Sequence, residues 1–277
     1  MAAALAAGLA LAGCGGGADD AIEETASKLG EIRSGKLSVK VLVSPTTEDS
    51  DIGFELEGPF ALSEGPDKLP QAQLRYTQIA GAERGGVEFI STAKGAWVEV
   101  DGQAYELPPD RVKGLRGGAS AGGGEGEGPF GELDVASWTT DEEVSDGEPA
   151  AGQATERVRA EVDVAKALND AIDALGELGG GDAVGALRPI EGEEAEQLEK
   201  AVKSAPLELV TGKDDRLLRR LKLDLDIGLD APRELAGGLG ELRGAKVTFD
   251  MRIEEPNGPV TVREPKEALP YTSLPQG

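Results

Sequence analysis

The sequence contains no histidine and a single cysteine. Without histidine, neither a Ser-His-Asp nor a Cys-His nucleophilic arrangement can form, and one cysteine cannot supply an ordinary zinc site. The chain also lacks a phosphate-binding G-x-x-x-x-G-K-[ST] motif and a G-x-G-x-x-G segment after a predicted strand. Paired carboxylates could hydrolyse glycosides, but with 52 acidic residues a pair such as Asp141 and Glu142 carries little signal. We therefore expect no enzyme, no metal site and no cofactor.

Basic residues are few, 28 against 52 acidic ones, which gives a formal net charge of -24. Such a chain repels phosphate backbones and anionic lipid surfaces, so we expect no nucleic-acid partner. The acidic residues are spread along the chain, which is typical of a solvated surface. Long apolar runs are also missing, because no stretch reaches the roughly 20 residues that span a bilayer.

The single cysteine, Cys14, ends the segment "MAAALAAGLALAGC", which is apolar and uncharged through Gly13. Its length and small residues are typical of a secretory signal peptide, although the usual Lys or Arg is missing. Leu11-Ala12-Gly13-Cys14 fits the lipobox of bacterial lipoproteins, in which the thiol receives a diacylglycerol group. We predict a signal peptide over 1–13 and a lipidated tether over 14–18, with acylated Cys14 holding the protein on a membrane. The alternative is an Ala/Gly leader with an incidental cysteine.

The first half of the chain changes from a helical to a strand period. Ile22, Ala26, Leu29 and Ile32 have helical spacing, and Gly35 is expected to end that helix. Alternation of apolar and polar residues then predicts antiparallel strands, with a tight turn at Asp101-Gly102. These strands are expected over 36–43, 51–58, 72–80, 86–93, 96–102 and 103–108.

The second half combines strands with helices. A strand is predicted over 156–164, and Asp163 is expected to cap a helix with one apolar stripe. That stripe consists of Val164, Leu168, Ile172, Leu175 and Leu178. A shorter helix is predicted over 192–205, with Ala195, Leu198 and Val202 facing inward, and two long strands over 217–229 and 245–256. The glycine-rich segment 114–131 is interpreted as a flexible loop, either a mobile flap or an ordinary insertion.

These elements predict an α+β fold, a strongly curved antiparallel sheet or half-barrel with helices packed on its concave face. We assign 19–265 to a single domain and 266–277 to a tail. Residual space under the helices is either packed shut or holds an apolar ligand, so each candidate below has core packing as its alternative. The candidate cavity residues are Val39, Val41, Phe54, Leu56, Leu74, Tyr76, Val98, Leu168, Ile172, Leu221, Leu223, Leu225, Val247, Phe249 and Met251.

The order of elements resembles the LppX/LprG group of bacterial lipoproteins, which are related in shape to the LolA and LolB carriers. The resemblance rests on the lipobox at Cys14, "WVEVDGQAYELP", "DVASWTTDEEV", "VTGKDDRLLRRLKLDLDI" and "KVTFDMRIEEPNGPVTVREP". It implies a LolA-like half-barrel, lipid-anchored at the outer face of the cell membrane, that shelters acyl chains of lipids or lipoglycans during transport. The alternative is an envelope sensor, regulator or structural lipoprotein with a filled cavity and an envelope protein as partner.

Overall fold

The computed structural model describes residues 16–46, 51–63, 65, 68–118, 135–177, 189–228 and 244–274. Its helices are α1 (Gly16–Ser27), α2 (Pro109–Gly118), α3 (Val135–Trp138), α4 (Val164–Glu177) and α6 (Glu193–Ala201), with short 3-10 helices η1 (Leu29–Glu31) and η3 (Tyr271–Ser273). The strands of the first half are β1 (Ser34–Pro45), β2 (Ile52–Ala61), β3 (Gln71–Ala80), β4 (Glu83–Ser91), β5 (Ala96–Val100) and β6 (Gln103–Glu106). Those of the second half are β7 (Thr139–Asp146), β8 (Thr155–Val162), β9 (Val202–Ser204), β10 (Pro206–Gly212), β11 (Leu218–Ile227), β12 (Ala245–Glu254) and β13 (Leu269–Pro270).

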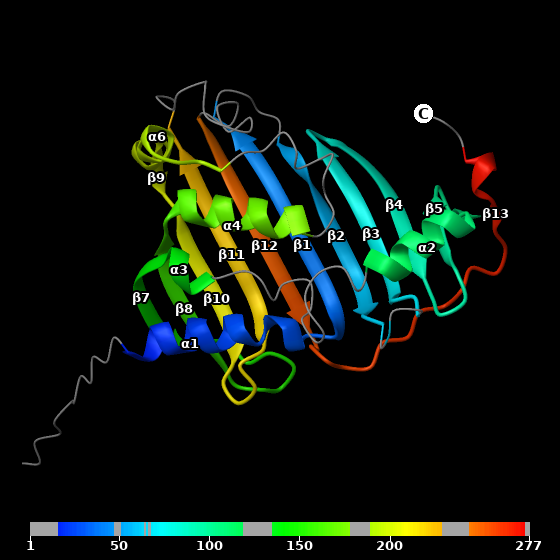
Figure 1. The fold of residues 1–277 in the computed structure, drawn as a ribbon, viewed down its shortest axis with the longest axis horizontal. Helices are drawn as coiled ribbons and strands as arrows, with labels where there is room; N and C mark the ends of the chain where they lie inside the picture. Colours follow the sequence, from blue (N-terminus) through cyan, green and yellow to red (C-terminus); the bar gives the residue numbers. More distant parts are fainter. Residues whose placement is uncertain are drawn as a thin grey trace, which may run out of the picture.

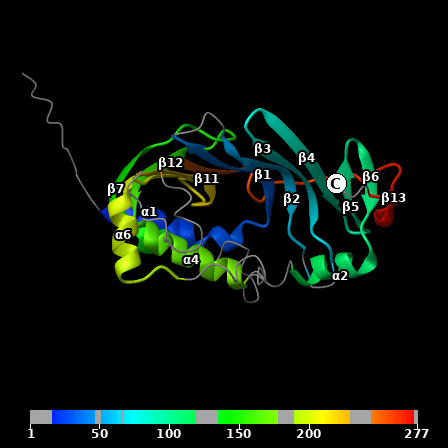
Figure 2. The same cartoon turned by 90° about the horizontal axis from the view of Figure 1, so that it is seen from above.

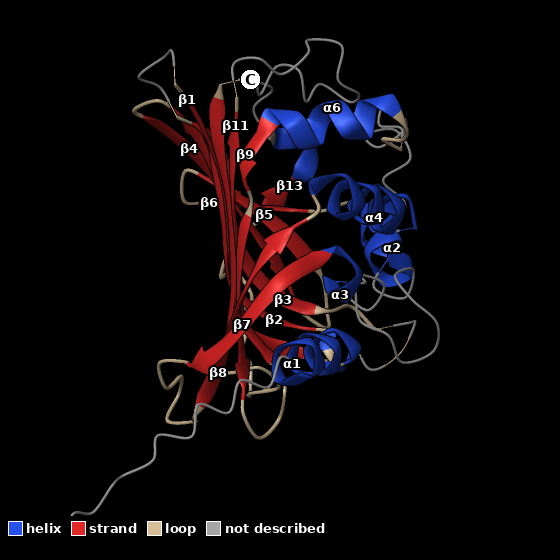
Figure 3. Ribbon diagram, turned by 90° about the vertical axis from the view of Figure 1, so that its left-hand side faces the viewer, coloured by secondary structure: helices blue, strands red, loops and turns tan. Residues whose placement is uncertain are grey.

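In the described part of the chain, all thirteen strands belong to one sheet in the order β13-β6-β5-β4-β3-β2-β1-β12-β11-β10-β8-β7, with β9 beside β11 (Figure 1). The pairings are antiparallel apart from β13 with β6, which is parallel. The sheet curves, and the helices lie on its concave side (Figures 2 and 3). The predicted α+β fold with a curved antiparallel sheet is therefore confirmed.

Over most of its strands the register separates an apolar concave face from a polar convex face, although Ile79 of β3 and Ile90 of β4 are buried on the convex side. Val41 of β1 lies opposite Phe249 of β12 and Phe54 of β2, and their polar neighbours point to the convex side. Because side chains alternate along a strand, apolar residues two apart share the concave face. The predicted tight turn between β5 and β6 is also confirmed, since Asp101 and Gly102 both have positive φ, 51° and 78°.

The main hydrophobic core lies between α1, α3, α4, α6 and the half of the sheet from β12 to β8. Ile22, Leu198 and Ile253 are almost fully buried there. Trp138 is also in this core, and its Nε1–H donates to Asp170 Oδ2 at 2.6 Å. Asp163 caps α4 as predicted, because its Oδ1 accepts a hydrogen bond from the backbone N–H of Lys166 at 3.1 Å.

Several predicted boundaries were wrong. The first helix ends at Ser27 rather than near Gly35, and Gly35 lies within β1. Leu29 and Ile32 are nevertheless buried, because the turn η1 carries them into the core. The predicted helix over 192–205 ends at Ala201, where Val202 begins β9 beside β11. In the second segment, pairing of β9 with β11 overrode the helical pattern.

The glycine-rich segment is partly helical. Residues 114–118, predicted as the start of a loop, form the second half of α2. The rest of that segment, 119–131, lies outside the described residues. Strands β7 and β10 were not predicted as separate elements, because their apolar residues are few or lie next to a long strand whose pattern is clearer.

Candidate functional site

The concave face of the sheet brings together the candidate residues of all six strands from which they were chosen. The register places the candidates of β1, β2, β3, β5, β11 and β12 on this one face. They divide into two groups according to what covers them. Leu221 and Met251 are buried, and Leu168 of α4 packs against the same core. Val39, Leu223, Leu225, Val247 and Phe249 are partly buried against it.

The remaining strand candidates lie outside that core. We call the part of the concave face that β1–β5 present, away from the core under α1, α3, α4 and α6, the open apolar face. Three of its side chains are large, apolar and well exposed: Ile52 at 51%, Val87 at 39% and Tyr76 at 38%. Exposed apolar side chains that adjoin one another on a single face mark an interaction surface more strongly than scattered ones. The face consists of Val41, Val43, Ile52, Phe54, Leu56, Leu74, Tyr76, Val87, Phe89, Val98 and Val100.

Charge is nearly absent from this face. At the concave register positions of β1–β5, Glu83 at the tip of the β3–β4 hairpin is the one charged residue. Phe54 and Tyr76 form a stacked ring pair with centroids 5.7 Å apart and an interplanar angle of 27°. The open apolar face can therefore bind hydrocarbon or ring surfaces by desolvation, and offers no group for nucleophilic or metal chemistry.

A glycine allows two strands to approach closely beside this face. Gly58 of β2 has φ of 144°, a conformation that L side chains rarely adopt. A Cβ atom at this position would lie 1.9 Å from the carbonyl oxygen of Gln73 on β3. The glycine is therefore required where β2 and β3 curve together.

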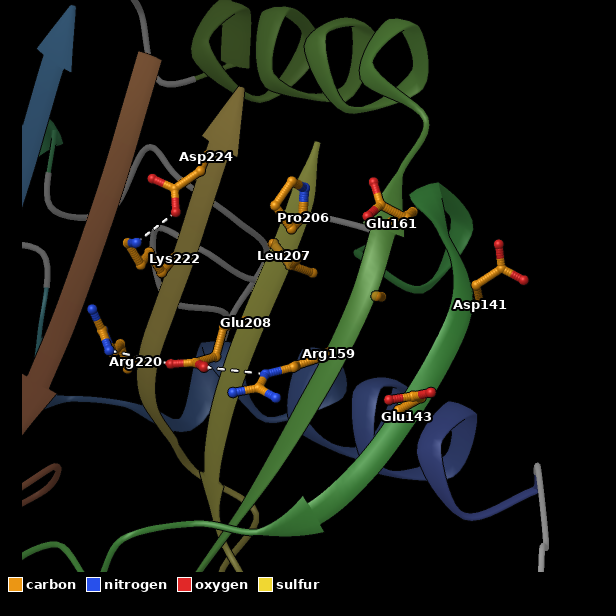
Figure 4. A pocket seen from close by; sticks show the side chains of 11 residues that line it. Asp141, Glu143, Arg159, Glu161, Pro206, Leu207, Glu208, Arg220, Lys222 and Asp224 are labelled. Carbon is orange, nitrogen blue, oxygen red and sulfur yellow. Dashed lines mark hydrogen bonds and ion pairs between the residues drawn. The ribbon is translucent and has the colours of Figure 1, made fainter. Parts of the chain in front are cut away.

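The convex face has the opposite character. An open hollow of about 610 Å³ lies over β8, β10 and β11, and its side chains are mostly charged (Figure 4). Arg220 donates to Glu208 at 3.2 Å and holds Asp250 of β12 with two hydrogen bonds, at 2.9 and 2.8 Å. Burial opposes ionisation of Asp250, but hydrogen bonds from Arg220 and Arg252 outweigh it and lower the pKa of this carboxyl from 3.8 to about 2. These arginine and carboxylate groups form hydrogen bonds and ion pairs with one another, as on an ordinary polar sheet surface.

Some predicted features lie outside the described residues. Cys14 is one of them, and in α4 the side chain of Ile172 is another. Within the described ranges, no helix combines the length and apolar character needed to cross a bilayer. No group of three or more potential metal ligands occurs in those ranges either.

The candidate set also missed residues of the open apolar face. The residues of the face that were not among the chosen candidates are Val43, Ile52, Val87, Phe89 and Val100. The signal was available, since each stands two residues from a chosen candidate or pairs with one. Alternation fixes which face a residue occupies, whereas the position of the helices decides how exposed it is.

The structure is similar to solved lipoproteins at low sequence identity. No family model and no curated protein matches the sequence. LprF from Mycobacterium bovis has a TM-score of 0.43 at 13% identity, over 90% of this chain and 97% of that one. The Mycobacterium tuberculosis lipoprotein LppX has a TM-score of 0.36 at 12% identity, over 90% of this chain and all of the other. A LolA superfamily protein from Nitrosomonas europaea has a TM-score of 0.21 at 10% identity, over 86% and 94%.

LprF and LppX are lipoproteins of the LppX/LprG type, the group that the order of sequence elements resembles. All three TM-scores lie below 0.5, so the case for a function rests on the residues of this chain.

Proposed function

We propose that this chain is a lipid-anchored protein of the cell envelope that binds the acyl chains of lipids or lipoglycans on its open apolar face and carries them. The observation that supports this proposal is the exposure of Ile52, Tyr76 and Val87 on a concave face almost free of charge. A surface of this kind loses unfavourable contact with water when a hydrocarbon chain covers it.

The free energy gained by burying an acyl chain on this face is small enough for reversible binding. Each methylene that leaves water for an apolar surface contributes about 0.8 kcal/mol, so six methylenes contribute about 5 kcal/mol before ordering costs. The exposed side chains are aliphatic or aromatic, and no charged side chain within the face would hold a headgroup tightly. Release to a membrane is therefore possible, because the acyl chain exchanges one apolar environment for another.

The anchor is the second part of the proposal. Acylation of Cys14 would hold the folded domain at the outer face of the cell membrane, with residues 14–18 as a tether. Both the signal peptide over 1–13 and this tether are inferred from sequence. An anchored carrier takes up and delivers lipid without leaving the membrane surface.

Native mass spectrometry of the Cys14→Ser protein, purified from its own host, tests the proposal. This substitution removes the acylation site and leaves the described domain unchanged. We expect a mass excess that organic extraction removes, with an acyl lipid in the extract. An unliganded mass, together with no uptake of added phospholipid or glycolipid, would contradict carriage and favour a regulatory or structural lipoprotein.

A further inference from the structure

Two uncharged polar groups occupy neighbouring positions on the concave side, the hydroxyl of Tyr76 in the open apolar face and the amide of Gln78 beside it. Tyr76 and Gln78 are consecutive concave-side residues of β3, opposite Leu56 and Phe54 of β2. Residues two apart on a strand are separated by about 7 Å, so their polar groups stand along one line of the face. Among the described residues, neither the Tyr76 hydroxyl nor the Gln78 amide has a hydrogen-bond partner, and both side chains are exposed.

The ring stack gives Tyr76 a fixed direction. Phe54 supports one side of the ring, with centroids 5.7 Å apart, so the phenol is held over the apolar face. Its hydroxyl and the Gln78 amide are uncharged donors within an apolar surface. Such donors suit an uncharged acceptor on an otherwise apolar ligand, because covering them without an acceptor would cost free energy.

The charged residues around Tyr76 and Gln78 disfavour an anionic acceptor, such as the headgroup of an acidic lipid. In the described residues of the β1–β2, β3–β4 and β5–β6 connections at this end of the sheet, Asp51, Glu83 and Asp101 stand against one cation, Arg84. The Arg84 guanidinium is already engaged, donating to the carbonyl oxygens of Gly81 and Glu83 at 2.8 and 2.9 Å. Among these described residues an anionic headgroup would therefore meet three like charges and one arginine whose Nη1 already bonds the backbone.

We propose that Tyr76 and Gln78 determine specificity by donating hydrogen bonds to the carbonyl oxygen of an uncharged acyl ester, whose chain lies on the adjoining apolar side chains. This inference rests on the proposed function and names its ligand class. The ester linkage would sit at the Tyr76–Gln78 position, with its hydrocarbon chain over Phe54, Leu56 and Leu74.

The test compares three ligands that share an eighteen-carbon chain. They are 1-oleoylglycerol, its ether analogue 1-O-oleylglycerol and oleate, each measured by displacement of the fluorescent hydrocarbon diphenylhexatriene. The variant Tyr76→Phe keeps the ring stack and removes the hydroxyl, and Gln78→Leu removes the amide at similar size. Tyr271→Phe is the matched control, because Tyr271 is also 38% exposed but lies in η3 near the β13 edge.

We expect the wild-type protein to prefer the ester over the ether and over oleate by about tenfold, the effect of one or two neutral hydrogen bonds. The double variant Tyr76→Phe/Gln78→Leu should bind ester and ether equally and should bind diphenylhexatriene at least as tightly as wild type, because both substitutions replace a polar group with an apolar one. Tyr271→Phe should match wild type. Equal ester and ether affinities in the wild-type protein, or oleate binding as tight as the ester, would overturn this inference alone. Failure of wild type to bind diphenylhexatriene and all three lipids would overturn the proposed function as well.

Discussion

Replacing Asp250 with asparagine should destabilise the sheet by about 2 kcal/mol at pH 7. The Asp250 carboxylate receives hydrogen bonds from Arg220 at 2.9 and 2.8 Å and from Arg252 at 3.3 and 3.0 Å. Its side chain is 15% exposed, so solvent weakens these contacts only modestly. The fall of its pKa from 3.8 to about 2 corresponds to about 2 kcal/mol of stabilisation.

The same pKa sets the direction of the pH dependence. Because the folded-state pKa is lower than the unfolded one, the stabilisation is fully present above about pH 4. It is lost as the pH falls from about 4 through about 2, where the folded protein also takes up the proton. The difference in stability between wild type and Asp250→Asn should therefore narrow across this window.

Urea unfolding followed by circular dichroism, at pH 7 and at steps down to pH 2, measures both effects. Asp226→Asn is the control, because Asp226 of β11 lies on the same convex side as Asp250 of β12 but has one ion pair within the described residues, with Lys203 at 3.8 Å. That variant should lose less than about 0.5 kcal/mol at pH 7. Equal losses in the two variants, or a loss for Asp250→Asn that does not change with pH, would refute the reasoning.

Three further substitutions test the face, the sheet and the core. Val87→Asp should weaken diphenylhexatriene binding at least tenfold, whereas Val144→Asp, at a side chain of similar exposure (40% against 39%) on the β7 edge, should leave it unchanged. Gly58→Ala should lower the free energy of unfolding by at least about 1–3 kcal/mol, because the added Cβ would clash with β3. Gly85→Ala has open space around its Cβ and should leave the stability unchanged, so equal melting temperatures of the two variants would contradict this. Asp163→Ala should cost about 1 kcal/mol in urea unfolding through loss of the α4 cap, and Asp163→Asn, which keeps a capping oxygen, should restore most of it.

The strand pattern could be predicted well because its cause is local. In β11 and β12, leucine, valine and phenylalanine alternate with charged residues, and a slip by one residue would expose the whole apolar set. The sequence therefore predicted correctly which residues of these strands share the concave face. The end of α6 could not be predicted in this way, because pairing of β9 with the distant strand β11 decided where this helix stops. The alternation also gave no sign of the 3-10 turn that follows α1.

The candidate site likewise combines a feature that the local pattern predicts, the face on which a residue lies, with one that it does not, the exposure of that residue. Val247 and Tyr76 look alike in the sequence, since each occupies a concave-side position of a predicted alternating strand. In the structure Val247 packs against the core, whereas Tyr76 is 38% exposed on the open apolar face. The alternation of residues along a strand does not predict this difference in exposure, because the exposure depends on which part of the sheet the helices cover.

The sequence by itself determined the α+β class, the apolar and polar faces of the sheet and the absence of histidine chemistry, because composition and periodicity are properties of the chain alone. Tertiary structure alone decided the order of the strands, the division of one apolar face into core and open surface, and the placement of Tyr76 beside Phe54. These features depend on contacts between residues far apart in the sequence, which local patterns do not specify.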